Sequence, residues 1–379
     1  MQIIWDVTRR CNLKCSFCYS GTENNQCIKE LSVETIKSQI LPKFSELGVD
    51  SVSFSGGEPT LKWDLVLWLT KEFAQRDYEY LVLCTNATIL TREMILEWKR
   101  AARGVRDLAL ALPLDSLDAD RMKELRPSHQ SIDVLDKVKT AINMCIEQKI
   151  WIFLETVLTS KNFSEIKQIS DFARSKGGKV FGEIYPCYLE GRAHENRELL
   201  LTVEQLRRFD RWHLTNLSKS ILFWDFMPFP VNPADWQVIR ERALSMGWSE
   251  GCPSVTRYLQ LGADGTVYPC SFLRIPLGNL VTDSVDQILS HPLARSIANR
   301  EVKGKCGECK HRIVCGGCRA RAFTETGDPL GEIPSCEGGQ EGHPLEKEFT
   351  EEVLKTFKWF NRMYKLAGIR RWLAKFRFY

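Results

Sequence analysis

Three cysteines near the start of the chain have the spacing that most directly indicates chemistry. Cys11, Cys15 and Cys18 follow the pattern C-x3-C-x2-C within one short loop. Three thiolates on one loop can hold one face of an iron–sulfur cube, which leaves one iron free for an outside ligand. The alternatives are a zinc site or a structural loop, but structural zinc takes four protein ligands. The spacing therefore favours an iron–sulfur cluster with one open iron.

A second group of cysteines lies between residues 250 and 340. It contains two C-x2-C pairs, a spacing that suits a zinc ribbon as well as iron–sulfur clusters. The stretch from Leu261 to Cys270 includes an Asp-Gly turn and predicts a hairpin that delivers Cys270 from a strand. In order, the cysteines of this region are Cys252, Cys270, Cys306, Cys309, Cys315, Cys318 and Cys336.

The first triplet, with the aromatic Phe17 directly before Cys18, resembles the signature of the radical S-adenosylmethionine (SAM) enzymes. In that family the open iron chelates SAM, and the reduced cluster releases a 5′-deoxyadenosyl radical that abstracts hydrogen from substrate. The stretch Gly56-Gly57-Glu58-Pro59 matches the family's GGEP motif, whose backbone and glutamate hold the SAM amino group. Two glycines also let a backbone approach a ligand closely.

Further positions resemble SAM contacts of the family in strand order. Pro113 stands where relatives carry a serine whose hydroxyl contacts the SAM ribose. Asp115 or Ser116 would make that contact instead. Arg126 would meet the SAM carboxylate as a charge-assisted pair, and Thr156 and Asn162 would lie near the adenosine. No side chain is assigned as a catalytic acid or base. The contacts implied for SAM are Phe17, Gly56, Gly57, Glu58, Pro59, Asn86, Asp115, Ser116, Arg126 and Thr156.

The second cysteine group resembles the SPASM extension of radical SAM enzymes, which carries two auxiliary [4Fe–4S] clusters. The inner set is one ligand short, so an open iron or a non-cysteine ligand is expected there, and Cys187 is the best spare cysteine. Ser271 follows Cys270 where sulfatase-maturating relatives place a catalytic Asp, which argues against that activity. The resemblance implies an inner set of Cys252, Cys270 and Cys318 and an outer set of Cys306, Cys309, Cys315 and Cys336.

A repeating strand–helix pattern must position these loops. Sites in parallel sheets form at the carboxyl ends of the strands, and the first cysteine loop follows the first expected strand. The fold class is therefore α/β, and the resemblance implies a partial (β/α)6 barrel. The expected strands are Ile3–Val7, Ser51–Ser55, Tyr80–Cys84, Leu108–Leu114, Trp151–Leu158 and Lys179–Tyr185.

Four parts are expected along the chain. The barrel spans 1–200, a helical linker with an aromatic loop spans 201–249, and the cysteine-rich SPASM domain spans 250–340. A basic amphipathic helical tail spans 341–379. The aromatic loop suits a lid, a domain seam or a hydrophobic substrate wall. The tail suits packing on the barrel, an anionic membrane surface or a dock for an acidic leader peptide.

Composition limits the class of protein. The chain has 379 residues, 44% of them apolar, but no run long enough to span a membrane and no signal peptide. Its 14 cysteines then indicate metal binding in a reducing compartment rather than disulfides. The formal net charge is +4. Residues 350–379 contain eight Lys or Arg and two Glu, so the remainder of the chain is near neutral. This distribution argues against nucleic-acid binding. A cytoplasmic enzyme is expected, with peripheral membrane contact through the tail as an alternative.

The function implied is radical SAM chemistry, most often on a ribosomally made peptide. A low-potential donor such as flavodoxin or ferredoxin would reduce the cluster. Because the chain begins at the barrel, a separate protein would have to bind a leader peptide. One alternative is a small-molecule or lipid-like substrate, suggested by the aromatic loop and the basic tail. A non-catalytic zinc or electron-transfer scaffold is the other, and the GGEP stretch argues against it.

Overall fold

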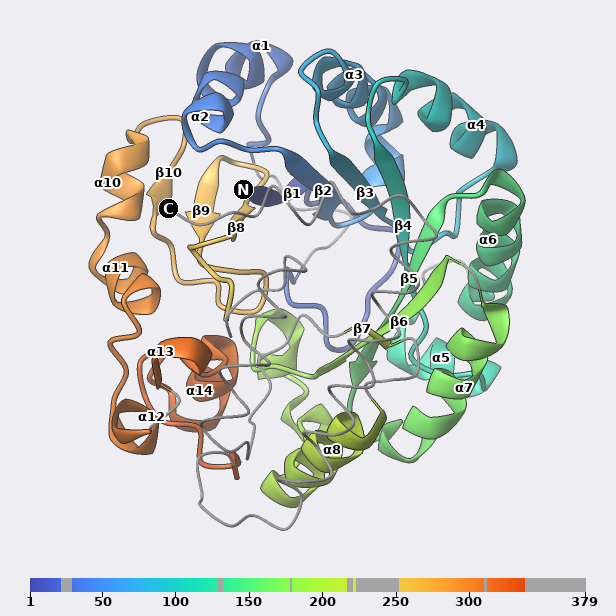
Figure 1. Ribbon diagram of the computed structural model, residues 1–379. Helices are drawn as coiled ribbons and strands as arrows, with labels where there is room; N and C mark the ends of the chain where they lie inside the picture. Colours follow the sequence, from blue (N-terminus) through green and yellow to red (C-terminus); the bar gives the residue numbers. More distant parts are fainter. Residues whose placement is uncertain are drawn as a thin grey trace. The chain divides into compact units, whose positions relative to one another are not determined.

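Parallel strands alternate with helices through the first 200 residues, so the expected α/β class and partial barrel are confirmed (Figure 1). The computed structural model describes residues 1–21, 29–128, 132–177, 179–216, 221–222, 252–309 and 312–337. Each expected strand is present, with ends within one residue of the prediction. These strands are β1 (Gln2–Thr8), β2 (Ser51–Gly56), β3 (Tyr80–Cys84), β4 (Asp107–Pro113), β5 (Trp151–Leu158) and β6 (Val180–Pro186).

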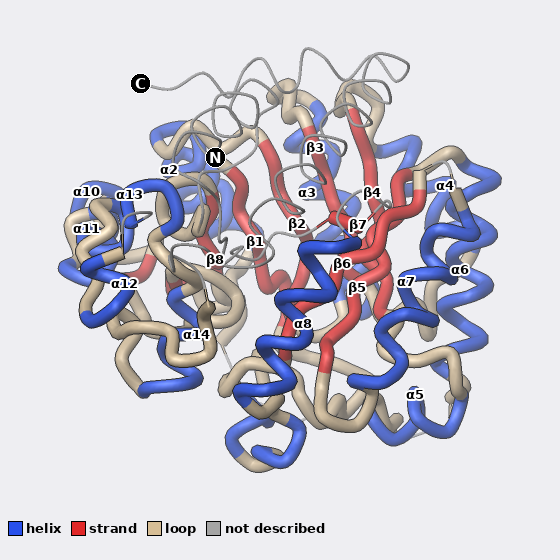
Figure 2. The backbone as a smooth tube through the Cα atoms, turned by 60° about the horizontal axis from the view of Figure 1, so that its bottom comes forward, coloured by secondary structure: helices blue, strands red, loops and turns tan. Residues whose placement is uncertain are grey.

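Helices follow the strands and cover one face of the sheet, as Figure 2 shows for α3, α4, α6 and α7. Side-chain caps begin several of them: Thr91, Asp118 and Asp133 each accept a hydrogen bond from a backbone N–H in the first turn. The helices of this region are α1 (Val33–Thr35), η1 (Ile36–Ile40), α2 (Leu41–Glu46), η2 (Pro59–Lys62), α3 (Trp63–Ala74), α4 (Arg92–Ala101), α5 (Ala119–Leu125), α6 (Val134–Gln148), η3 (Phe163–Glu165), α7 (Ile166–Lys176), η4 (Gly191–His194) and η5 (Arg197–Leu199).

The core lies on both faces of this sheet. On the outer face, Phe73 stacks on Phe44 and Phe54 at ring-centroid distances of 6.4 and 6.0 Å. On the inner face, Trp151 stacks on Phe181 at 5.6 Å, near the amino ends of the strands. Apolar side chains thus fill the amino-terminal end of the sheet's inner face, and polar side chains are left to gather at the carboxyl ends.

A hairpin from far along the sequence completes the first unit, which comprises residues 1–200 and 254–298. β8 (Tyr258–Leu261) pairs in parallel with β1, Gln2 facing Tyr258 and Trp5 facing Leu261. β8 also pairs antiparallel with β9 (Thr266–Tyr268), so the expected hairpin is present. Strand order in this unit is β10-β9-β8-β1-β2-β3-β4-β5-β6. Its remaining elements are β10 (Gly278–Asn279), α10 (Val285–Leu289) and α11 (Pro292–Ala298).

The second unit comprises residues 201–253 and 299–379. The aromatic loop from 223 and the tail 341–379 lie outside the described residues, as do Cys27 and His311. Within the described part of the chain, we find no helix with the length and apolar content to cross a bilayer. The described elements of this unit are α8 (Val203–Asn216), β7 (Ile221–Leu222), α12 (Gly304–Glu308), α13 (Arg312–Cys315) and α14 (Arg319–Thr326).

Candidate cofactor site

The first cysteine loop follows β1 and is anchored by its own backbone. The N–H groups of Lys14 and Ser16 donate to the carbonyls of Pro127 and Leu125, each within 3.0 Å. The buried Arg192 donates from Nε to the Cys15 carbonyl at 3.0 Å. Its backbone N–H donates to the Cys18 carbonyl, also at 3.0 Å. Backbone carbonyls and N–H groups of the loop therefore make most of the contacts that set its geometry, and Cys11 Sγ accepts one further bond from the Leu13 N–H at 3.4 Å.

Burial keeps two of the three thiols protonated in the absence of a metal. It raises the pKa of Cys11 to about 12 and that of Cys15 to about 11. The neighbouring thiols contribute to both shifts, while Arg126 acts against burial at Cys15. Metal ligation requires thiolates, so filling this site would release protons.

The GGEP turn packs directly against the residues that precede Cys11. Gly57 donates its N–H to the Thr8 carbonyl, and Glu58 donates its N–H to the Arg10 carbonyl, both at 2.8 Å. A Cβ on Gly57 would lie 2.0 Å from the Arg10 carbonyl oxygen, so only glycine fits. Gly56 has φ +116°, a backbone conformation that also favours glycine. Pro59 is buried at the start of η2.

The Glu58 carboxylate is fully buried and ties this turn to the end of β3. It accepts hydrogen bonds from Thr85 Oγ1 and the Asn86 N–H, both at 2.7 Å, and from Thr60. Burial raises its pKa, and these bonds act in the opposite direction. Asn86 in turn donates to Asn12 at 2.8 Å and lies 3.9 Å from Cys11 Sγ.

Arg126 and Asp115 form a pair beside the second cysteine. Arg126 Nε contacts the Asp115 carboxylate, and Arg126 Nη1 lies 3.7 Å from Cys15 Sγ. The guanidinium also lies over the Phe17 ring, 5.0 Å from its centroid. Asp115 is fully buried and accepts a further bond from the Val157 N–H at 2.9 Å. The structure thus brings Phe17, Asp115 and Arg126 to the thiol of Cys15.

Two other expected SAM contacts have hydroxyls that are already bonded within the protein. Thr156 Oγ1 donates to the Leu114 carbonyl at 2.7 Å. Ser116 Oγ contacts the Glu165 carboxylate. Asn162 donates to the Asp115 carbonyl at 2.8 Å. Thr156 and Asn162 thus join the ends of β4 and β5, and Ser116 joins the end of β4 to η3.

Sequence reasoning missed a polar chain that links the Cys270 hairpin to β1. Ser271 Oγ and Gln260 are 2.7 Å apart, and Gln260 Nε2 donates to Asp6 at 2.7 Å. Arg274 pairs with the same Asp6 carboxylate at 2.9 Å. The sequence feature that could have predicted this chain is the presence of two polar residues, Asp6 and Gln260, inside apolar strands. Cys187 is buried, and its N–H donates to the Leu158 carbonyl at 2.8 Å.

Cysteines of the second unit gather around Cys315. Burial raises the pKa of Cys315, and the thiols of Cys336, Cys309 and Cys306 raise it further, so these thiols lie within electrostatic reach. The Cys252 N–H donates to the Cys315 carbonyl at 3.2 Å. Among the described residues, no group of three or more Cys, His, Asp or Glu is arranged to hold a single metal ion. In an iron–sulfur cube, the thiolates bind different irons.

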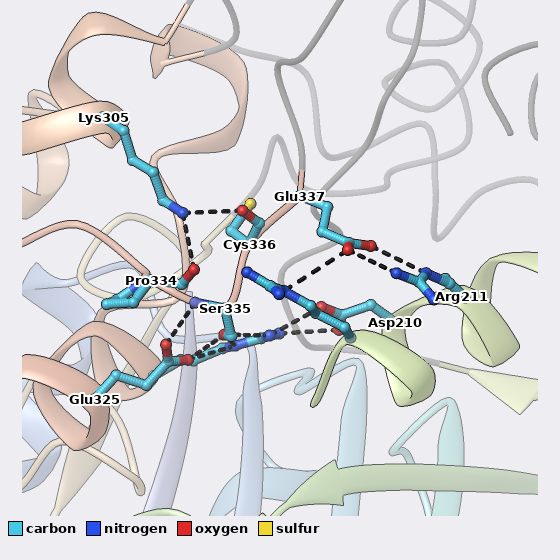
Figure 3. A network of polar contacts seen from close by, with 10 residues as sticks. Asp210, Arg211, Lys305, Glu325, Pro334, Ser335, Cys336 and Glu337 are labelled. Atoms are coloured by element: carbon cyan, nitrogen blue, oxygen red, sulfur yellow. Dashed lines mark hydrogen bonds and ion pairs between the residues drawn. The ribbon is translucent and has the colours of Figure 1, made fainter. Parts of the chain in front are cut away.

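A buried ion network fixes the segment that carries Cys336 (Figure 3). Arg321 donates to both oxygens of Asp210 at 2.9 and 2.8 Å, and it contacts Glu325 at 3.0 Å. Glu325 accepts the Ser335 N–H at 2.8 Å. Lys305 donates to the Cys336 carbonyl at 2.9 Å and to the carbonyl just before Ser335 at 3.0 Å. This network therefore holds the last cysteine beside α12.

The donor chemistry of both units fits iron–sulfur clusters. In the first unit, the three thiols stand on one loop, and the glycine turn closes against that loop. In the second unit, three thiols lie within electrostatic reach of the Cys315 thiol. Cys318 is the N-cap residue of α14, and Cys270 follows β9 in the first unit.

Comparison with known proteins gives two family matches and similar relatives. The radical SAM superfamily model matches residues 5–173, and the SPASM model, an iron–sulfur cluster-binding domain, matches 252–311. An AdoMet-dependent heme synthase of Methanosarcina barkeri is 26% identical over 351 residues, 88% of this chain and 95% of the relative. A PqqA peptide cyclase of Bradyrhizobium diazoefficiens is 28% identical over 348 residues, 89% of this chain and 86% of the relative. The solved structure of native anSMEcpe with bound AdoMet has the same fold, with a TM-score of 0.63, 18% identity and coverage of 97% of this chain and 98% of that chain.

Proposed function

Because this chain belongs to the radical SAM superfamily and carries a SPASM domain, we propose that it is an enzyme that modifies a peptide. Its cofactors are a [4Fe–4S] cluster, SAM and auxiliary iron–sulfur clusters. Bound together, they supply reductive cleavage of SAM to a 5′-deoxyadenosyl radical. The radical would take a hydrogen atom from the peptide, and a flavodoxin or ferredoxin would deliver the electron.

The residues proposed to hold the cofactors lie around the first cysteine loop. Cys11, Cys15 and Cys18 would hold the SAM cluster, and the backbone of Gly56 and Gly57 would receive the SAM amino group. Support comes from the close packing of the glycine turn on the loop, which leaves no room for a Cβ at Gly57.

Arg126 and Asp115 would meet the polar groups of SAM beside Cys15. The Arg126–Asp115 pair is partly buried, so it is held in place for a charged ligand. Glu58 and Asn86 would act mainly by fixing the ends of β2 and β3, because the Glu58 carboxylate bonds both strand ends.

The peptide proposal rests on one observation, the similarity to a PqqA peptide cyclase along 89% of this chain. The test is co-expression, under anaerobic conditions, with each short open reading frame encoded beside the gene. We expect one peptide to lose a hydrogen pair or gain a cross-link, as read by intact mass and fragmentation. Loss of the product in Cys15→Ala would assign it to this enzyme.

The similarity to heme synthases favours a second candidate, a tetrapyrrole substrate. The same purified enzyme, reduced with dithionite and given SAM, is then incubated with iron coproporphyrin III in place of peptide. Release of 5′-deoxyadenosine that depends on the porphyrin, with no change in any neighbouring peptide, would replace the peptide proposal.

Peripheral membrane contact through residues 341–379 and a separate leader-binding protein are further proposals. The tail lies outside the described residues, so the membrane proposal rests on its basic amphipathic sequence alone. The leader-binding protein rests on the peptide proposal. Liposome binding that is lost on deletion of 350–379 would support the first.

A further inference from the structure

Arg319 is a buried cation whose hydrogen bonds are incomplete. Its side chain is 2% exposed and donates to the carbonyls of Gly317, Gly331 and Pro329 at 3.0, 2.9 and 3.3 Å. All three acceptors are neutral. Its Nη2 is buried and, among the described residues, has no hydrogen-bond partner. Asp328 lies within electrostatic reach of this guanidinium, but its carboxylate bonds Lys303 and leaves Nη2 without an acceptor. A buried charged group with an incomplete set of hydrogen bonds is costly, so the position favours a further anionic neighbour at Nη2.

The unpaired nitrogen lies at the turn between Cys315 and Cys318. Gly316 and Gly317 have φ +64° and +65°, so the turn uses two consecutive left-handed residues. A Cβ on Gly317 would lie 2.1 Å from Arg319 Nη2. The N–H of the same Gly317 donates to Cys315 Sγ at 3.3 Å. The Arg319 guanidinium and the Cys315 thiol therefore both contact Gly317.

A second guanidinium lies on the same turn. A Cβ on Gly316 would lie 2.6 Å from Cδ and 2.8 Å from Nη1 of Arg300. Arg300 is 9% exposed and donates from Nη1 to the Cys252 carbonyl at 2.9 Å. Two positive charges thus border the turn between Cys315 and Cys318. This arrangement suits a negatively charged metal–thiolate cluster better than an empty cysteine loop.

We propose that Arg319 tunes the auxiliary cluster that Cys315 helps to hold: its Nη2 donates to a sulfur of that cluster, and its charge raises the reduction potential. This inference rests on the proposed assignment of Cys306, Cys309, Cys315 and Cys336 as ligands. A cluster with four thiolates is anionic, and reduction adds a further negative charge. A buried cation therefore stabilises the reduced form more than the oxidised form, and sulfur hydrogen bonds act in the same direction. Arg319 is a positioning and tuning residue, and it need not touch substrate.

The test is a redox titration of the auxiliary clusters in the full-length, cluster-loaded enzyme, followed by electron paramagnetic resonance. Arg319→Gln removes the charge and retains a shorter donor, whereas Arg319→Lys keeps the charge and loses the planar fork. Arg312→Gln is the matched control, because it removes an equal charge from an exposed position on α13. No peptide is added, so the result does not depend on the proposed substrate.

We expect Arg319→Gln to lower the potential of one auxiliary cluster, Arg319→Lys to lower it less, and Arg312→Gln to leave it unchanged. The SAM-cluster signal should be the same in all four proteins. An unchanged potential in Arg319→Gln with full iron content would overturn the proposal. If Arg319→Gln loads no auxiliary iron, Arg319→Lys decides: a lowered potential supports tuning, whereas a wild-type potential contradicts it. Loss of auxiliary iron from both variants, with Arg312→Gln fully loaded, would make Arg319 a folding residue and also overturn the proposal.

Discussion

Cys15 and Cys145 are both buried thiols, yet their surroundings differ. Cys15 lies 3.7 Å from the Arg126 guanidinium, on a loop with two other thiols. Cys145 is fully buried on α6, and burial alone raises its pKa to about 12. At Cys15 the Arg126 guanidinium partly offsets the effect of burial on the thiol pKa, whereas at Cys145 burial acts alone. The two cysteines therefore make a matched pair for mutation.

Cys15→Ala should abolish dithionite-dependent release of 5′-deoxyadenosine and remove about a third of the iron, because the SAM cluster loses a ligand. Cys145→Ala should keep the iron and the release, and lower the free energy of unfolding by about 1–2 kcal/mol through lost packing. Iron assay, product chromatography and urea unfolding measure these effects. Wild-type release from Cys15→Ala would contradict the proposed ligand set.

Glu155 makes stability depend on pH. Burial raises its pKa to about 7, Asp115 adds to the shift, and Arg126 opposes it. The unfolded value is about 4.3, so the folded chain holds this proton more tightly. The resulting stabilisation is complete below about pH 4 and is lost as the pH rises through about 7.

Glu155→Gln cannot ionise, so relative to wild type it should become more stable by about 3 kcal/mol between pH 4 and pH 8. Anaerobic urea unfolding at both pH values measures the difference. Glu147→Gln, at an exposed position on α6, is the control and should change the unfolding free energy little at either pH. A constant difference between wild type and Glu155→Gln would show that Glu155 is not shifted.

Residue types alone identified the cysteines but not their polar partners. The spacing of Cys11, Cys15 and Cys18 is visible in one line of sequence, because all three proposed ligands lie on one loop. The contact of Arg126 with Asp115 joins the C-terminal cap of α5 to a residue just after β4, and the contact of Arg319 with Gly317 depends on a left-handed turn. Which side chains meet in these contacts depends on backbone conformation, which the residue types alone do not give.

At the scale of elements, the strands were predictable and one neighbour relation was not. β1, β2 and β6 are short runs buried on both faces as parallel strands are, and β5 alternates buried and half-buried residues, so the positions of these strands are visible in composition and pattern. The parallel pairing of β8 with β1 joins residues more than 250 positions apart. Because β8 is short and has an ordinary hairpin sequence, nothing in it indicates which strand it joins.

The ion network of α8 and α14 should be essential to the second unit. Arg321→Met leaves the carboxylate of Asp210 buried without its partner, which should cost about 3–5 kcal/mol. Arg211→Met at the exposed pair with Glu337 is the control and should cost less than about 1 kcal/mol. Urea unfolding measures both, and equal losses would contradict the distinction between buried and exposed pairs.

Iron content tests the whole molecule. Three [4Fe–4S] clusters predict about twelve irons and as many sulfides per chain after anaerobic reconstitution. About four irons, with zinc in the remainder and SAM cleavage intact, would mean that the C-terminal cysteines form a zinc site. Metal analysis with sulfide assay distinguishes these outcomes before any substrate is known.

The pairing of β8 with β1 has a consequence for any attempt to divide the protein. In a chain cut before residue 254, β1 would lose its parallel neighbour, and the backbone N–H and C=O groups of Gln2 to Trp5 on that side would be exposed. An unprotected strand of this kind recruits other chains and promotes aggregation. The barrel is therefore not expected to be stable when residues 1–253 are produced alone, because β8 covers the edge strand β1.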